Sequence, residues 1–339
     1  MADGTDKNDG SINTSYWIWT VIFIVFAVVL VIHFLPEIKK DLLLLKSVKF
    51  YWLAFAIMAQ LLTYFFAATV YRILIRSYHL KENPSIGALI KATIISLFFN
   101  QTVPSGGISG NTFIFRFLKR FDMPVTDIIS LIVIELSCYY AALEILIIGS
   151  LLGCLLPAGE TPHAIKVTLI AGIFIFILLG TLMLLAGRKQ FLVKVYDQLR
   201  KIKFFRKRLS AEMLETANQE TKLLQNKRLP IIKSICFQLL VLLSDCFTVY
   251  ALLLGLGAET SAFTVLLVFL CTRIIAILPI SPGALVLYES SMVFFFSALG
   301  VPVGTGIVVT LLYRLLSFWL PMPAGLILYR NEQRKDSQP

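Results

Sequence analysis

Long blocks of apolar residues, separated by short polar segments, run through almost the whole chain of 339 residues. A helix that crosses the hydrocarbon core of a bilayer needs about 20 apolar residues. By that criterion, membrane-spanning helices are predicted at Tyr16–Leu35, Phe50–Ile75, Asp127–Leu156, Ala164–Ala186, Ile231–Gly257, Ala262–Ile280 and Val303–Tyr329. We therefore expect an all-α, polytopic integral membrane protein, a helix bundle of about eight spans.

Two interruptions divide stretches that would otherwise continue as helices. The interrupting residues are Pro104, Gly106 and Gly107 in the first break and Ser281, Pro282 and Gly283 in the second. Shorter apolar pieces flank these breaks at Ile86–Val103, Asn111–Leu118 and Leu285–Leu299. A broken backbone in hydrocarbon leaves unpaired N–H and C=O groups, so it persists only where protein covers it or where it lines a wet cavity. Such breaks are typical of transport sites.

The two breaks have similar sequences and lie 178 residues apart, counted from Pro104 to Pro282. Pro104-Ser-Gly-Gly resembles Ser281-Pro-Gly-Ala, which suggests an internal repeat built around broken helices. The pattern is compatible with two re-entrant hairpins and equally with two pairs of complete but kinked spans.

Charge is sparse and unevenly placed. Only 15% of residues are charged, whereas soluble domains carry roughly 25%. The net charge of +11 comes mainly from residues 188–233, which hold thirteen Lys and Arg against four acidic residues. Basic loops remain in the cytoplasm, and this one also suits contact with an anionic lipid surface. We do not expect nucleic-acid binding.

Placing residues 188–233 in the cytoplasm orients the other segments of a single transmembrane domain that covers residues 1–339. The polar N-terminal tail (1–15) and the polar C-terminal tail (330–339) both become cytoplasmic, and the expected location is the plasma (inner) membrane. The segment Pro36–Lys49 opposes this orientation, because its four lysines then lie outside. The first two predicted spans, Tyr16–Leu35 and Phe50–Ile75, are therefore the least constrained part of the topology.

The residues that usually bind metals are not arranged to do so. The five cysteines lie in apolar blocks without a CxxC pair, and the three histidines are far apart in the sequence. Zinc sites and metalloprotease motifs need closely spaced ligands. We expect no metal and no other cofactor.

Ionisable residues inside apolar spans are costly, so each one is a candidate functional residue. The deep set comprises Glu135, Glu144, Asp245, Arg273 and Arg314, with Glu289 just after the second break and Arg116 after the first. Glu135 and Glu144 are nine positions apart, about 900° of rotation, so they lie on opposite sides of one helix. The two arginines can pair with Asp245 and Glu289, either as neutralising pairs or as parts of a binding site.

The charges of this deep set match more than one ligand. Counting Glu289, four acids face two arginines, which suits an amine-bearing headgroup or proton coupling. The N-termini of broken helices favour phosphate instead. A phospholipid headgroup carries both kinds of charge.

Three segments at these same positions resemble a known family. The first is Leu97-Phe-Phe-Asn100-Gln-Thr-Val-Pro-Ser-Gly-Gly-Ile-Ser-Gly110, followed by the basic Arg116-Phe-Leu-Lys-Arg120. The others are Leu278-Pro-Ile-Ser-Pro-Gly-Ala-Leu-Val-Leu-Tyr-Glu289 and Leu312-Tyr-Arg314-Leu-Leu-Ser-Phe-Trp-Leu-Pro321. They resemble the lysylphosphatidylglycerol synthase transmembrane region, also called the UPF0104 or flippase-like membrane family. One difference is Gly283-Ala284, where that family often has Gly-Gly.

The resemblance implies lipid translocation. In full-length synthases of that family a flippase region precedes a soluble aminoacyl-transferase domain, which we do not expect in this chain. We therefore expect a flippase for phospholipids, including aminoacylated or lipid-linked ones. Glu289 and Arg314 would contact the headgroup, supported by Asn100, Arg116 and Arg273. The alternatives are a membrane-embedded transferase acting on lipids and an accessory subunit of a separate lipid-modifying enzyme; the oligomeric state stays open.

Overall fold

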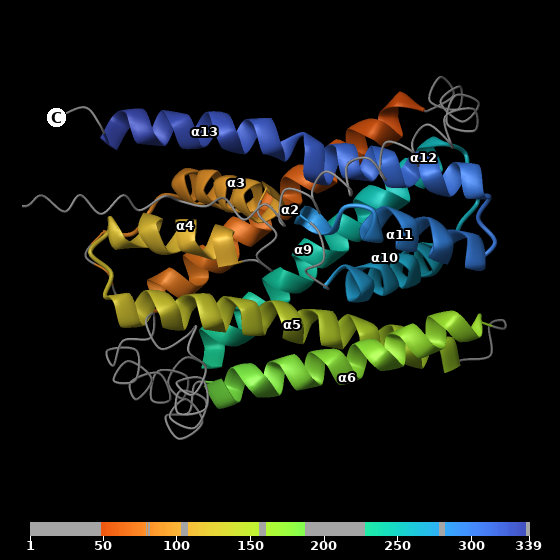
Figure 1. The fold of residues 1–339 in the computed structure, drawn as a ribbon, viewed down its shortest axis with the longest axis horizontal. Helices are drawn as coiled ribbons and strands as arrows, with labels where there is room; N and C mark the ends of the chain where they lie inside the picture. The colour runs from red at the N-terminus through yellow and green to blue at the C-terminus, as the bar shows by residue number, and fades with distance from the viewer. Residues whose placement is uncertain are drawn as a thin grey trace, which may run out of the picture.

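The computed structural model describes residues 49–78, 80, 82–102, 108–155, 161–186, 228–277 and 282–336. Within these ranges the chain is helical and contains no β-strand (Figure 1). The α-helices are α2 (Phe50–Arg76), α3 (Ile86–Thr102), α4 (Ile108–Lys119), α5 (Val125–Leu155), α6 (His163–Ala186), α9 (Arg228–Gly255), α10 (Ala262–Ala276), α11 (Leu287–Ala298), α12 (Val303–Arg314) and α13 (Pro321–Asp336). A 3-10 turn, η2 (Pro282–Ala284), and a π-helical segment, η3 (Leu315–Trp319), complete the set.

The predicted all-α membrane fold is confirmed. Within the described residues, five helical stretches are long and apolar enough to cross a membrane: α2, α5, α6, α9 and the continuous stretch formed by α12, η3 and α13. Large apolar side chains such as Phe174, Leu178 and Leu152 are exposed on α6 and α5, as lipid-facing residues are in a bilayer. The predicted first span, Tyr16–Leu35, lies outside the described residues.

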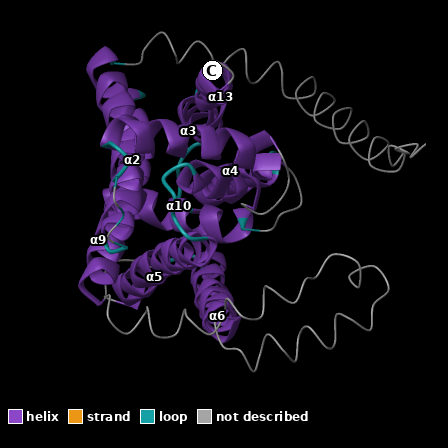
Figure 2. Ribbon diagram, turned by 90° about the vertical axis from the view of Figure 1, so that its left-hand side faces the viewer, coloured by secondary structure: helices purple, strands orange, loops and turns teal. Residues whose placement is uncertain are grey.

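The antiparallel helices α2 and α9 pack against each other along their lengths and cross the bundle together (Figure 1). The Lys49 N–H donates to the Gly255 carbonyl at 3.0 Å, which joins the start of α2 to the end of α9. In the end-on view, α10 lies near the centre, with α3 and α4 above it and α5 below it (Figure 2). Helix α9 carries the buried polar residues Gln238 and Asp245 into this interior.

Four helices are too short to cross a bilayer. Helices α3 and α4 have 17 and 12 residues, and α10 and α11 have 15 and 12. At 1.5 Å per residue even the longest spans about 26 Å, less than the ~30 Å hydrocarbon core. The predicted span Ala262–Ile280 is therefore incomplete, because α10 ends at Ala276. Its apolar sequence continues beyond the helix.

The short helices form two hairpins that enter from opposite ends of the bundle. Helix α4 leads through a short turn to the start of α5 (Figure 1). Helix α10 starts at the other end of α5, where the Phe263 ring lies against Gly153. The tips of the hairpins meet inside the bundle, since α3 contacts η2. The two breaks thus belong to re-entrant hairpins, a choice that the sequence leaves open.

Hydrogen bonds close the first hairpin across its break. The Asn100 side-chain oxygen accepts from the Gly110 N–H at 2.7 Å and from the Ser109 hydroxyl at 3.3 Å. These bonds satisfy an N–H group of the first turn of α4, which has no partner within its own helix. Gly110 also lies against Ser96 of α3 so closely that a Cβ would collide with the Ser96 carbonyl. Pro104, Gly106 and Gly107 lie outside the described residues.

The second break is built from left-handed backbone. Gly283, Ala284 and Val286 have φ angles of 56°, 53° and 70°. This conformation is costly for residues with a side chain, above all for β-branched valine. A Cβ at Gly283 would also collide with the Phe318 ring. The strained loop therefore persists because neighbouring residues hold it in place.

Basic residues gather at one end of the described bundle. That end holds Arg72, Arg76, Lys91, Arg116, Lys119, Arg120, Arg228, Lys233, Arg330 and Arg334, whereas Lys49 and Lys166 lie at the other. Two predicted polar segments are partly helical: α9 begins at Arg228, inside the predicted loop 188–233, and α13 continues to Asp336, inside the predicted tail 330–339.

The close contact at Gly110 predicts that Gly110→Ala lowers the melting temperature in detergent. Overpacking typically costs about 1–3 kcal/mol, and here the obstacle is backbone. Gly149→Ala is the matched control, because nothing lies within 4 Å of a Cβ at that helical position; it should leave stability unchanged or raise it slightly. Equal melting temperatures for the two variants would contradict the packing argument.

Candidate functional site

The second break holds a buried ion pair. Arg314, the last residue of α12, donates from Nε to Glu289 Oε1 at 2.5 Å and from Nη2 to the Gly283 carbonyl at 3.0 Å. Its guanidinium also lies 4.2 Å from the centroid of the Phe318 ring, a cation–π contact. Arg314 therefore fixes the loop backbone and the Glu289 carboxylate at the same time.

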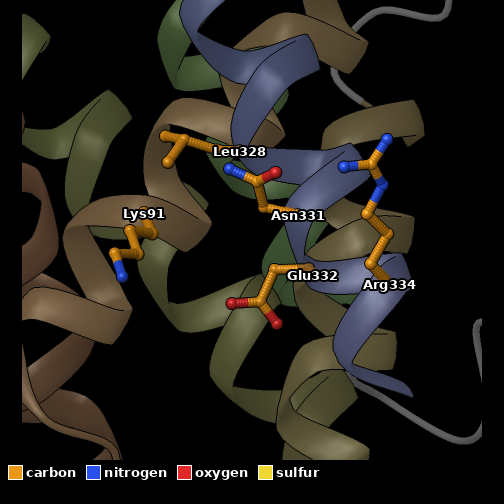
Figure 3. A pocket seen from close by; sticks show the side chains of 5 residues that line it. All are labelled: Lys91, Leu328, Asn331, Glu332 and Arg334. Atoms are coloured by element: carbon orange, nitrogen blue, oxygen red, sulfur yellow. The ribbon is translucent and has the colours of Figure 1, made fainter. Parts of the chain in front are cut away.

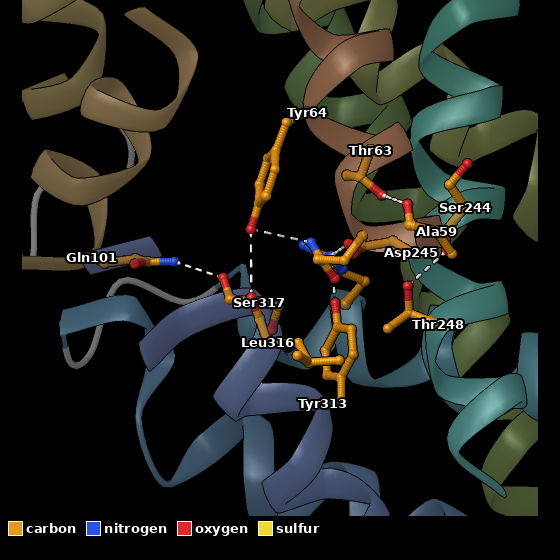
Figure 4. Close-up of polar contacts among 12 residues, drawn as sticks. Ala59, Thr63, Tyr64, Gln101, Ser244, Asp245, Thr248, Tyr313, Leu316 and Ser317 are labelled. Atoms are coloured by element: carbon orange, nitrogen blue, oxygen red, sulfur yellow. Dashed lines mark hydrogen bonds and ion pairs between the residues drawn. The ribbon is translucent and has the colours of Figure 1, made fainter. Parts of the chain in front are cut away.

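A second ion pair joins α10 to α9. Arg273, in the last turn of α10, donates from Nη2 to Asp245 Oδ2 of α9 and, at 3.2 Å, to the Tyr313 hydroxyl of α12. Its guanidinium lies 4.9 Å from the centroid of the Phe269 ring. Figure 4 shows Asp245 and Tyr313 converging from their two helices. The pairings Arg273–Asp245 and Arg314–Glu289 are those proposed from the sequence.

Two tyrosines join the pairs into one cluster. The rings of Tyr288 and Tyr313 stack with centroids 6.0 Å apart. The Tyr288 ring lies 5.9 Å from the Arg273 guanidinium and 5.0 Å from that of Arg314. We call this cluster the paired-charge site; it comprises Asp245, Arg273, Tyr288, Glu289, Tyr313 and Arg314.

Within the paired-charge site each pair has one covered and one partly accessible member. The side chains of Asp245 and Arg314 are 8% and 7% exposed, whereas those of Arg273 and Glu289 are 26% and 24% exposed. The site thus presents one cation and one anion, each backed by a buried counter-ion. Among the described residues, Arg273 Nε and Glu289 Oε2 have no hydrogen-bond partner. Both atoms are buried in this structure, so a ligand could bind them only after a rearrangement that exposes them.

The π-helical turn directly after Arg314 is bound by two residues from other helices. The Leu320 N–H donates to the Leu315 carbonyl, five residues back, at 2.9 Å. Because the Leu320 N–H bonds to Leu315 and Pro321 has no N–H, the carbonyls of Leu316 and Ser317 lack helical donors. Tyr64 of α2 and Gln101 of α3 supply them, at 3.5 Å and 3.0 Å (Figure 4). The sequence analysis missed both residues; Pro321 was the signal that pointed to such partners.

The remaining predicted site residues occupy separate places. Glu135 of α5 accepts a hydrogen bond from Gln238 Nε2 of α9 at 2.9 Å. Asn100 lies at the tip of the first hairpin, where it holds α4. Arg116 is exposed on α4 and joins no contact of the paired-charge site within the described residues. Pro282 begins η2, whereas Ser281 lies outside the described residues.

A small polar cavity of about 300 Å³ lies at the basic end, between α3 and α13 (Figure 3). Lys91, Leu328, Asn331, Glu332 and Arg334 line it. Glu332 also accepts from Arg120 Nη1 at 3.0 Å. This cavity shares no residue with the paired-charge site.

Pro321 leaves the Ser317 carbonyl without a helical donor. The loss of stability on replacing Gln101 should therefore depend on whether Pro321 is present. Gln101→Leu should lower the unfolding free energy by about 1–3 kcal/mol, since it leaves a buried carbonyl without a donor. In a Pro321→Ala background the alanine N–H can serve the Ser317 carbonyl, so the same substitution should cost clearly less. A double-mutant cycle of detergent unfolding measures the difference. An equal cost in both backgrounds would show that Gln101 has another role.

Comparison with known proteins identifies the family. The sequence model described as "Lysylphosphatidylglycerol synthase TM region" matches residues 16–325. A UPF0104 membrane protein of Pyrococcus horikoshii is 22% identical over 282 residues, 74% of this chain and 79% of that protein. Another, from Methanocaldococcus jannaschii, is 25% identical over 244 residues, 69% of this chain and 71% of that protein. The chain therefore belongs to the lysylphosphatidylglycerol synthase transmembrane region family.

Proposed function

We propose that the protein is a flippase that moves phospholipids between the two leaflets of a membrane. The observation that carries this proposal is the pair of partly accessible, oppositely charged side chains, Arg273 and Glu289, in the interior of the bundle. The headgroup of a zwitterionic phospholipid carries a phosphate and an ammonium group. It is complementary to such a pair.

Arg273 and Glu289 can each form one more hydrogen bond, and from this we propose a role for each. Arg273 Nε is a buried donor without a partner among the described residues, and a phosphate oxygen would accept from it once a movement of the site exposes it. Glu289 Oε2 is an acceptor in the same situation, and an ammonium group would donate to it. When no lipid is bound, Asp245 supplies a counter-ion to Arg273 and Arg314 supplies one to Glu289.

The architecture also supports transport. The hairpins α3–α4 and α10–α11 enter from opposite ends and meet beside the paired-charge site. Sites of this kind, formed by broken helices near the middle of a membrane, are typical of alternating-access transporters. The family description names the transmembrane region of a lipid synthase, which favours a lipid, including an aminoacylated one, as the substrate.

The charge distribution supports an orientation in the plasma membrane. The end with most Lys and Arg would face the cytoplasm, and the start of α9 and the end of α13 would then lie on that side (Figure 1). There the basic residues would contact anionic lipid headgroups.

Substitutions at the paired-charge site should separate headgroup classes. Glu289→Gln can still accept from Arg314 but loses its charge. We expect it to slow translocation of labelled phosphatidylethanolamine at least tenfold, and that of phosphatidylglycerol, which has no amine, much less. Arg273→Lys, which loses the planar guanidinium, should slow both lipids. Headgroup accessibility in proteoliposomes measures the rates.

Glu332→Gln at the basic end is the control and should translocate both lipids at the wild-type rate. Wild-type rates for both site variants would refute the assigned roles. A folded wild type that moves no lipid would favour a transferase or an accessory subunit instead.

The orientation predicts the behaviour of reporter fusions in a bacterial inner membrane. A green fluorescent protein fused after Pro339 should fluoresce, because its position would be cytoplasmic. Alkaline phosphatase fused after Pro162, at the opposite end of the bundle, should be active because it would be exported. The reverse pattern would invert the proposed orientation.

A further inference from the structure

We propose that Glu135 is a separate proton-binding site and that its protonation couples lipid movement to a proton gradient. This inference rests on the proposed flippase function, which by itself specifies no energy source. It begins with an imbalance of charge: the paired-charge site contains two arginines and two carboxylates, so it is neutral without Glu135.

Glu135 has a neutral partner, whereas Asp245 and Glu289 have arginines and the two oxygens of Glu144 have no hydrogen-bond partner among the described residues. Its Oε1 accepts from Gln238 Nε2 at 2.9 Å, and Gln238 is only 3% exposed. An unpaired carboxylate at this depth is costly, whereas the protonated acid is not. An amide side chain suits both forms, because its N–H donates to a carboxylate and its oxygen can accept from a carboxylic acid.

The groups around Glu135 include no cation. From α2 it interacts with Tyr71, from α9 with Gln238, and from its own helix with Cys138, Tyr139 and Tyr140. Helices α4, α6 and α10 also pack on α5, but in the described part of the chain they contribute no charged group that interacts with Glu135. A proton can neutralise such a group, because it binds a single carboxylate oxygen and leaves an uncharged acid.

Glu135 is linked to the paired-charge site along the contact between α5 and α9. Tyr139, one turn further along α5, interacts electrostatically with Glu135, Arg273 and Asp245. Gln238 and Asp245 are seven residues apart on α9, which is about 10 Å along the same face. Protonation of Glu135 removes a negative charge close to the Arg273–Asp245 pair and so changes the field in which a headgroup binds.

The proposed step transfers only a proton. Glu135 is partly accessible, so a hydronium ion from one side of the membrane can protonate the carboxylate and leave water. The carboxylic acid later returns the proton to water on the other side. Each cycle moves one positive charge and regenerates the carboxylate.

The test compares two glutamates on the same helix. Proteoliposomes with labelled phosphatidylethanolamine receive a pH gradient of either sign. For the wild type we expect one sign to accelerate translocation several-fold. Glu135→Gln keeps the contact with Gln238 and imitates the neutral acid, so it should move lipid at one rate whatever the gradient. Glu144→Gln, on the opposite side of α5, should respond like the wild type.

Several outcomes would overturn the proposal. The proposal is wrong if Glu135→Gln responds to the gradient as the wild type does. It is also wrong if Glu144→Gln loses the response. A wild type that moves lipid without responding to the gradient overturns the coupling but leaves the flippase function standing. A wild type that moves no lipid removes both.

A second measurement detects the proton without relying on transport. The infrared difference spectrum between the wild type and Glu135→Gln should contain a carboxylic-acid carbonyl band that disappears as the pH is raised. If that band is missing at every pH at which the protein stays folded, Glu135 is not the proton site.

Discussion

The need to satisfy broken backbone inside a membrane determines much of this structure. Arg314 illustrates the constraint, because one guanidinium binds the Gly283 carbonyl of the second break and the carboxylate of Glu289. A buried arginine needs that carboxylate, and the loop needs that donor. The interaction that stabilises the break therefore also positions a charged group beside it. The proposed binding site thus follows from the requirements of folding.

The same constraint connects the first hairpin to the segment after Arg314. Pro321 and the π-helical turn leave two carbonyls without helical donors, and the side chains that serve them come from α2 and α3. Gln101 is at the tip of the first hairpin, so the segment after Arg314 is held by the hairpin that enters from the other end. Movement of the first hairpin must break this hydrogen bond or carry η3 along. A change of access at one end would thereby reach the paired-charge site.

The sequence predicted those features that depend on composition along the chain. Helix α5 was predicted at Asp127–Leu156 and spans Val125–Leu155, because the length of an apolar block is a one-dimensional property. The Arg273–Asp245 and Arg314–Glu289 pairs followed from the cost of isolated charges. By contrast, the apolar sequence after Ala276 concealed the end of α10, and the good helix formers after Tyr329 extended α13 beyond its predicted end. Tyr64 and Gln101 are polar but uncharged, so hydropathy did not single them out.

Glu135 shows why residue type alone could not complete the functional interpretation. The sequence grouped it with Asp245 and Glu289, yet these two carboxylates contact arginines whereas Glu135 contacts an amide. A carboxylate paired with arginine tends to stay ionised, while one beside a neutral donor can exchange a proton at lower cost. In the proposed mechanism, the partner distinguishes Glu289, which would contact the headgroup, from Glu135, which would bind the proton. The proposed coupling depends on this division, because a fully paired interior would have no group left to titrate.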